Sequence, residues 1–129
     1  MGKAIANVLS NFLGLKNTGR ISQGIEVSNE ALKTELDIDV DMILSLTGHE
    51  LRKYLIKKKL TSDHLELLAD YFIEYGNYQM QLKRGIAVRA FKRVLELFAI
   101  VNENTTTYSV ERKNKESEVE DLLKAFAAH

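Results

Sequence analysis

Apolar residues recur with the period of an α-helix along nearly the whole chain, and this spacing constrains the fold more than any other feature. The clearest segment covers residues 86–101, where the apolar side chains follow at intervals of four, three, four and three. They are Ala87, Phe91, Val94, Phe98 and Val101. Residues spaced in this way share one face of a helix, so the segment predicts an amphipathic helix. The polar residues expected on its other side are Arg89, Lys92, Arg93 and Glu96.

The composition agrees with a helical protein. The 129 residues include neither proline nor cysteine, and the formal net charge at pH 7 is zero. An interior proline costs a helix about 3 kcal/mol, so its absence suits long uninterrupted helices. Without cysteine the chain has no disulfide, thiolate metal site or cysteine nucleophile. Because small secreted domains are commonly rich in disulfides, we predict a cytoplasmic protein, and we find no segment of transmembrane length.

A second periodic segment precedes the first and is expected to pair with it. Its apolar residues form two adjacent stripes: Leu65, Leu68, Phe72, Tyr75 and Leu82 in one, and Leu67, Tyr71 and Tyr78 in the other. Thr61, Ser62 or Asp63 can cap its first amides. The stripe continues in phase past Gly76, which predicts an unbroken helix and a close approach by another helix at the glycine. With a short turn at 83–85, the two helices must run antiparallel.

The rest of the chain is expected to be helical as well. The predicted elements are an N-terminal hairpin over about 3–36, connecting helices over about 39–59, the long hairpin over about 62–102 and a C-terminal helix over about 109–127. The first hairpin contains helices over 3–15 and 20–36 around a turn at 17–19. Thr47 with Glu50, and Ser109, are expected to cap the helices that they precede. We therefore predict one all-α domain over 1–129, a short bundle or superhelix of about six to seven helices.

The segments 20–36 and 85–102 are similar to each other. Gly24, Ile25, Ser28, Ala31 and Leu32 align with Ala87, Val88, Phe91, Val94 and Leu95. This pattern resembles the second helix of a tetratricopeptide repeat. That helix carries a small residue, an aromatic four positions later, and then a compact residue followed by leucine. Tyr71 and Tyr78 stand where the first helix of that repeat has aromatics. The glycine at which the two helices of such a repeat touch is replaced here by Tyr75, and Gly76 follows one position later.

The order of the segments also resembles a family of small bacterial proteins with tetratricopeptide-like helices. The stretches that carry this resemblance are Glu30-Ala31-Leu32, Asp41 to Leu46, Val94 to Leu97 and Tyr108 to Arg112. The resemblance implies antiparallel hairpins packed as a short right-handed superhelix. It implies no catalytic activity, and helical repeats generally present surfaces to other proteins.

Three aspartates alternate like the start of a calcium-binding loop, at Asp37, Asp39 and Asp41. Such a loop needs glycine at its sixth position and glutamate at its twelfth, where this chain has Met42 and Gly48. The aspartates are therefore interpreted as a helix start, where carboxylates oppose the positive end of the helix dipole.

No other pattern indicates a catalytic or metal site. The chain has three histidines without the spacing of metal ligands, at His49, His64 and His129. The first two are expected to be exposed in the first turns of helices. Three carboxylates that share a helix face are interpreted as a solvent-facing surface, at Glu66, Asp70 and Glu74. We expect no cofactor, no metal and no enzymatic activity.

Protein binding is therefore the leading functional hypothesis. Basic residues cluster at 52–59 and 83–93, where they form either a solvated face or a docking site for an acidic partner. Aromatic residues cluster on the long hairpin, where they either pack in the core or line a groove for a ligand or peptide. The candidate partner-binding residues are Tyr71, Tyr75, Tyr78, Arg89 and Arg93. The expected partner is another protein or a second copy of this chain in a homodimer, and neither nucleic acid nor a membrane is expected. The alternatives are a small helical-bundle enzyme or ligand-binding protein, and a homo-oligomeric structural building block.

Overall fold

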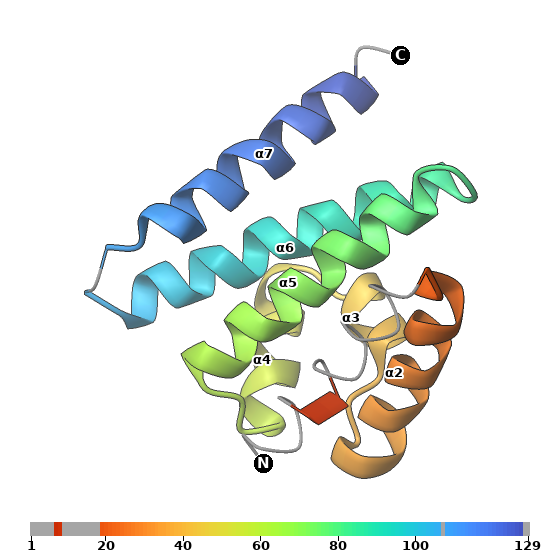
Figure 1. Cartoon of the computed structure of the whole chain (residues 1–129). Helices are drawn as coiled ribbons and strands as arrows, with labels where there is room; N and C mark the ends of the chain where they lie inside the picture. Colours follow the sequence, from red (N-terminus) through yellow and green to blue (C-terminus); the bar gives the residue numbers. More distant parts are fainter. Residues whose placement is uncertain (1–6, 9–18, 107, 128–129) are drawn as a thin grey trace. The chain divides into compact units, whose positions relative to one another are not determined.

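The computed structural model describes residues 7–8, 19–106 and 108–127. Within these ranges the chain forms six α-helices and no β-strand, which confirms the predicted all-α class (Figure 1). The helices are α2 (Ile21–Leu36), α3 (Val40–Ser45), α4 (Gly48–Lys57), α5 (Ser62–Gln79), α6 (Arg84–Asn104) and α7 (Val110–Ala127). None of these helices has the length and apolar character needed to cross a membrane.

Two compact units divide the chain, Met1–Leu60 and Thr61–His129. The boundary falls between the predicted connecting helices and the predicted long hairpin. The expectation of one domain over 1–129 stays a prediction. The predicted helix over 3–15 lies outside the described residues except for Asn7 and Val8, and of the turn at 17–19 only Gly19 is described.

In the first unit, the aspartate-rich segment ends one helix and begins the next. Asp37 terminates α2 in the left-handed conformation (φ 54°), and the N–H of Ile38 donates to the carbonyl of Leu32 (3.0 Å). Such a bond satisfies a free carbonyl at the helix end. Asp39 caps α3 by accepting a hydrogen bond from the N–H of Met42 (3.3 Å). The helix-start interpretation is thus confirmed for Asp39, whereas Asp37 ends a helix.

The capping prediction for α4 is wrong. Thr47 occupies the N-cap position, but its side chain makes no capping hydrogen bond, so the pattern with Glu50 does not form a capping box. The backbone of Gly48 has φ 53°, a conformation that costs a glycine little. The core residues of this unit that are almost completely buried are Leu32, Ile38, Ile43 and Leu51.

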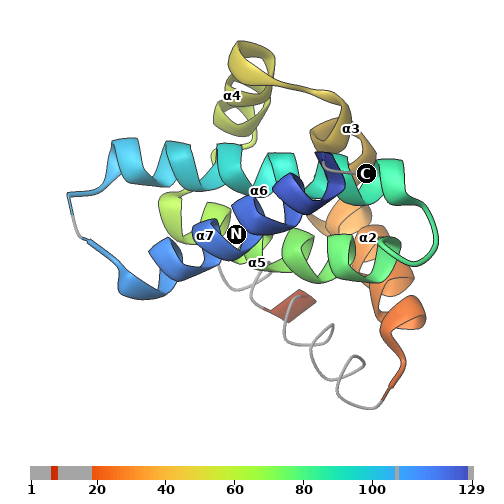
Figure 2. The ribbon, with the colours of Figure 1, turned by 90° about the horizontal axis from the view of Figure 1, so that it is seen from above.

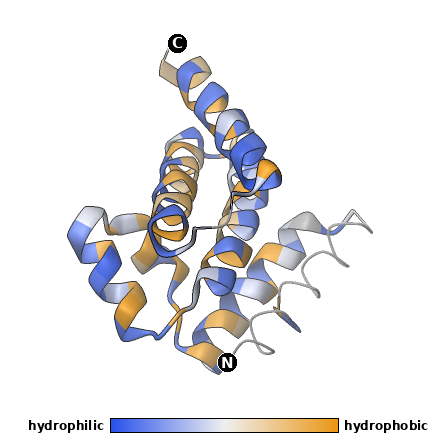
Figure 3. Ribbon diagram, turned by 90° about the vertical axis from the view of Figure 1, so that its left-hand side faces the viewer, coloured by the Kyte–Doolittle hydropathy of each residue, from blue (hydrophilic) through white to orange (hydrophobic). Residues whose placement is uncertain are grey.

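The second unit consists of an antiparallel α5–α6 hairpin and α7, which runs back along α6 (Figures 1 and 2). All five residues of the predicted α6 stripe are buried. Arg93, predicted on the polar side, is also buried, because the buried face of α6 is wider than the predicted stripe and includes Ala90, Leu97 and Ile100. By contrast α7 is mainly hydrophilic, as the helix that ends at C in Figure 3 shows, and only Arg112 and Val119 of its 18 residues are buried.

The long hairpin is close-packed at Gly76. The helix α5 continues through this residue, as predicted. A Cβ atom placed on Gly76 would lie 2.6 Å from Cε1 of Phe91, so no larger residue fits beside that ring. The missing side chain therefore sets the distance between α5 and α6, which confirms the expected close approach.

The turn of the hairpin lies earlier than predicted. The helix α5 ends at Gln79 and α6 begins at Arg84, so the turn occupies 80–83 and not 83–85. Leu82 consequently leaves the predicted apolar stripe and is 61% exposed.

Side-chain caps begin two helices of this unit. The N–H of His64 donates to Oγ1 of Thr61 (3.3 Å), and the N–H of Thr61 donates to Nδ1 of His64 (3.1 Å). This reciprocal pair satisfies two free amides and buries His64, which corrects the expectation that the histidine is exposed. Ser109 caps α7 as predicted, because its Oγ accepts from the N–H of Arg112 (3.1 Å).

Candidate functional site

The five predicted partner-binding residues differ in how much surface they present. Tyr71, Tyr75 and Arg93 are only 2%, 6% and 5% exposed. The two tyrosines contribute to an aromatic cluster with Phe72, with ring centroids 5.8 to 6.2 Å apart. Burial raises the pKa of the Tyr71 hydroxyl, because the interior disfavours the phenolate. These three side chains belong to the interior of the fold.

Tyr78 and Arg89 are the members of the predicted set that reach the surface. Tyr78 is half-buried near the end of α5, and Arg89 is exposed on α6. As a partner-binding surface the set stays a prediction, and only these two residues can contact a partner while the fold is intact.

The basic cluster at 52–59 is partly engaged within its own unit. Nζ of Lys58 lies 2.7 Å from Oδ2 of Asp37 and 5.4 Å from the centroid of the Tyr54 ring. The hydrogen bond and charge of Lys58 lower the pKa of Asp37, and the hydrogen bond to Asp37 raises the pKa of Lys58. This pair holds the end of α4 against the end of α2.

The cluster at 83–93 is more exposed and adjoins apolar residues. No acidic residue occurs between Glu74 and Glu96. Within this stretch the exposed cations and exposed large apolar residues define what we term the basic end of the α5–α6 hairpin. It comprises Met80, Leu82, Lys83, Arg84, Arg89 and Lys92. Arg89 and Lys92 are three residues apart and therefore share a helix face.

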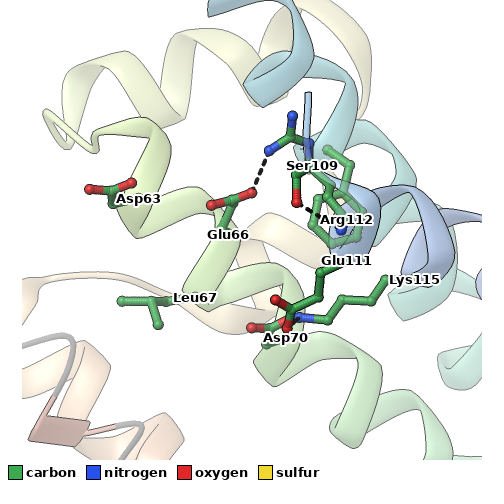
Figure 4. A pocket seen from close by; sticks show the side chains of 9 residues that line it. Asp63, Glu66, Leu67, Asp70, Ser109, Glu111, Arg112 and Lys115 are labelled. Carbon is green, nitrogen blue, oxygen red and sulfur yellow. Dashed lines mark hydrogen bonds and ion pairs between the residues drawn. The ribbon is translucent and has the colours of Figure 1, made fainter. Parts of the chain in front are cut away.

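A second group of charged residues joins α7 to α5. Arg112 is 9% exposed, and its NH1 donates to Oε1 of Glu66 (2.7 Å). Nζ of Lys115 donates to Oδ1 of Asp70 (2.7 Å). We term these four residues the ionic clasp (Figure 4). Each pair is partly exposed, and such pairs contribute about 0–1 kcal/mol.

Further hydrogen bonds support the clasp. Nε of Arg112 donates to Oδ1 of Asn102 (2.8 Å), whose Nδ2 donates to Oε1 of Glu116 (3.0 Å). Lys115 also lies 3.3 Å from Glu111. Burial by itself would lower the pKa of Lys115, but hydrogen bonds and charges of Asp70 and Glu111 outweigh it and raise the pKa. The network holds the ammonium group of Lys115 in its charged form.

A pocket of about 340 Å³ lies at the clasp, between the start of α5 and the start of α7 (Figure 4). The side chains that line it are Asp63, Glu66, Leu67, Asp70, Phe98, Ser109, Glu111, Arg112 and Lys115. Three of its four carboxylates are paired with its two cations. Glu66 and Asp70 are therefore interhelix partners, which corrects their interpretation as a solvent-facing surface.

The other end of α7 is held by aromatic contacts. The Phe126 ring stacks on Phe91, with centroids 6.2 Å apart and an interplanar angle of 29°. The guanidinium carbon of Arg84 lies 4.7 Å from the Phe126 centroid. Val119 is buried between the two ends. The helix is thus attached by charges at its start, by one buried apolar residue in its middle and by a ring at its end.

Sequence reasoning missed the clasp, although its spacing is visible. Arg112 and Lys115 continue the apolar stripe of Val119, Leu122 and Phe126 at intervals of three and four. Cations in phase with an apolar stripe indicate that the helix docks on a surface with acidic groups. The signal that matches these cations is the pair of carboxylates on α5, Glu66 and Asp70, which are four residues apart.

The described ranges contain no group of three or more His, Asp or Glu side chains arranged as metal ligands. Comparison with known protein families, curated proteins and solved structures found no match to this chain.

Proposed function

We propose that this chain is a non-catalytic protein-interaction module, and that the basic end of the α5–α6 hairpin binds an acidic segment of a partner protein. The observation that carries the proposal is the meeting of exposed cations with exposed apolar side chains on a stretch without acidic residues. Charge steers association and apolar contacts supply much of the affinity, so this composition suits a protein surface.

The same composition favours a protein over nucleic acid as the partner. Leu82 and Met80 offer apolar area that a phosphate backbone does not use. The formal net charge of zero supplies no general attraction for a polyanion. Acidic side chains that flank an apolar residue match both features of this surface.

The proposed architecture behind this surface is a short tetratricopeptide-like superhelix. The contact between Gly76 and Phe91 supports it, because glycine there performs the close packing that the resemblance assigns to a helix-contact glycine. The buried Ala87, Phe91 and Val94 further support it, since they carry the resemblance in α6.

The rival is a ligand-binding or enzymatic helical bundle, which would use the pocket at the ionic clasp. Its cations are engaged by its own carboxylates, and these pairs join two helices. Groups that neutralise one another in this way serve attachment of α7, which favours the interaction module.

The test is affinity capture from an extract of the native cells with two charge-reversed variants. The first carries Lys83→Glu, Arg89→Glu and Lys92→Glu. The matched control carries Lys53→Glu, Lys57→Glu and Lys59→Glu, which reverse exposed cations on α4 and just after its end. We expect the first variant to lose acidic partners by at least about tenfold, because each exposed pair contributes up to about 1 kcal/mol. Equal retention by both variants, with circular dichroism showing intact helices, would disprove the proposed surface.

A further inference from the structure

We propose that the partner of the basic end of the α5–α6 hairpin is a second copy of this chain, which docks there through an acidic surface on α2 and α3. The inference rests on the proposed function, because it names the acidic segment that the basic end binds. The two surfaces in contact are different, so the association is head-to-tail and continues from copy to copy as a ring or a filament.

The acidic surface lies within the first compact unit. Glu26 and Glu30 are four residues apart on α2 and therefore share a helix face, and Asp41 is exposed in the first turn of α3. These three carboxylates line a common hollow of about 230 Å³. The sequence from 26 to 41 contains Lys33 as its one cation. The surface is therefore acidic as a whole.

Exposed apolar side chains stand beside these carboxylates. Val27 directly follows Glu26 and is 46% exposed, and Met42 directly follows Asp41 and is 45% exposed. The basic end of the hairpin has the same composition with the opposite charge. The two surfaces thus match in both respects, because unlike charges steer association and apolar contacts supply much of the affinity.

The charges of both surfaces are available to a partner. Six exposed groups form no ion pair with any residue in the described ranges: Glu26, Glu30 and Asp41 on the acidic surface, and Lys83, Arg89 and Lys92 at the basic end. The formal net charge of the chain is zero. Copies can therefore neutralise one another's surfaces in succession without accumulating charge.

The other exposed apolar residues in the described part of the chain lack such acidic neighbours. Ile56 stands among the lysines of α4. Tyr108 and Val110 lie near Glu111, whose carboxylate is 3.3 Å from Nζ of Lys115 and is thus already paired. Free carboxylates beside exposed apolar side chains therefore select the acidic surface on α2 and α3 as the occupant of the basic end.

The experiment mixes two full-length variants that each keep one surface. The first loses the basic end through Lys83→Gln, Arg89→Gln and Lys92→Gln, and the second loses the acidic surface through Glu26→Gln, Glu30→Gln and Asp41→Asn. By light scattering, the mass of the wild type should rise with protein concentration, whereas either variant alone should keep the single-chain mass. Their equimolar mixture should form a complex of twice that mass and no larger, because one pair of matching surfaces remains.

A third variant separates this contact from general attraction between unlike net charges. It lacks both surfaces and also carries Glu118→Gln, Glu120→Gln and Asp121→Asn at exposed positions of α7, so its net charge equals that of the second variant. Mixed with the first variant, it should keep the single-chain mass. In the wild type, an increase from about 0.05 to 0.5 M salt should weaken association at least about tenfold, because salt screens exposed charges.

Single-chain mass in the mixture of the first two variants, with helical content retained by circular dichroism, would overturn self-association. Equal complex formation by the third variant would do the same. Should a variant lose its helices, the wild type decides, since a single-chain mass maintained up to millimolar protein contradicts the proposal. Loss of an acidic partner from the extract on charge reversal, together with single-chain mass here, would leave the proposed function standing and this inference refuted. The two failures are therefore distinguishable.

Discussion

The contact between Gly76 and Phe91 shows how a single hydrogen atom in place of a methyl group decides the distance between two helices. The Phe91 ring is completely buried and stacked against Phe126, so it has little freedom to yield. A glycine inside a helix normally costs about 1 kcal/mol relative to alanine. In this protein the close packing of Phe91 against Gly76 offsets that cost.

We therefore expect Gly76→Ala to lower the free energy of unfolding by up to about 2 kcal/mol, because overpacking costs about 1–3 kcal/mol and the gain in helix propensity returns only about 1 kcal/mol. Urea denaturation measures the change. Gly85→Ala is the control, since no atom lies within 4 Å of a Cβ atom placed there. A stabilising effect of Gly76→Ala would contradict the close approach.

The caps of α5 and α4 offer a second comparison between single residues. Thr61 and His64 satisfy each other's amides, whereas Thr47 makes no side-chain capping bond. We expect Thr61→Ala to cost about 1 kcal/mol and Thr47→Ala only a few tenths. Thermal unfolding of the two variants measures the difference, and equal losses would argue against the reciprocal cap.

Among the helices of the second unit, α7 is the one whose attachment depends on charge. The buried guanidinium of Arg112 joins α7 to Glu66 of α5 and Asn102 of α6. We expect Arg112→Ala to lower the free energy of unfolding by about 1–3 kcal/mol, because charged hydrogen bonds are lost. Hydrogen exchange should show the largest loss of protection within 110–127. Lys113→Ala, at an exposed neighbouring position, should leave the exchange pattern unchanged.

Alkaline pH should weaken the same attachment. The folded pKa of Lys115 is raised above its ordinary value of 10.5. The stabilisation is fully present below the ordinary pKa of 10.5, and it is lost as pH rises through the higher folded pKa. The melting temperature of the wild type should therefore fall more steeply above about pH 10.5 than that of Lys115→Gln. Parallel pH profiles would show that the ammonium group does not stabilise the docked α7.

For the whole molecule, the balance of charges matters more than any single pair. The formal net charge is zero at pH 7. Molecules without net charge repel one another least, so solubility should pass through a minimum near pH 7 and rise on either side. Turbidity measured from pH 5 to 9 checks this. A steady trend across the range would contradict it.

Most of the helical architecture was predictable from the sequence, because helix formation and helix ends depend on near neighbours. The apolar stripe of α6 and the unbroken α5 follow from intervals of three and four residues. The cap at Ser109 follows from the residue type beside a periodic segment. The turn at 80–83 was misplaced because Leu82 happens to fall in phase with the stripe although the helix has already ended.

The candidate sites were less predictable, because a side chain's environment depends on distant residues. Arg93 was expected on the polar side of its helix and is buried, and Tyr75, a candidate partner-binding residue, lies in the core. The clasp was missed because Arg112 and Glu66 lie 46 positions apart, and neither looks unusual within its own helix.

The sequence by itself determined that this chain is helical and where most of its helices run, since each turn is stabilised by residues three and four positions away. Only the tertiary structure decided which polar groups leave water. His64, Arg93 and Arg112 are buried because packing around their helices covers them, and for Arg112 the compensating carboxylate comes from another helix. Burial of a charge is favourable only with a partner, and in this protein such a partner is brought near by folding.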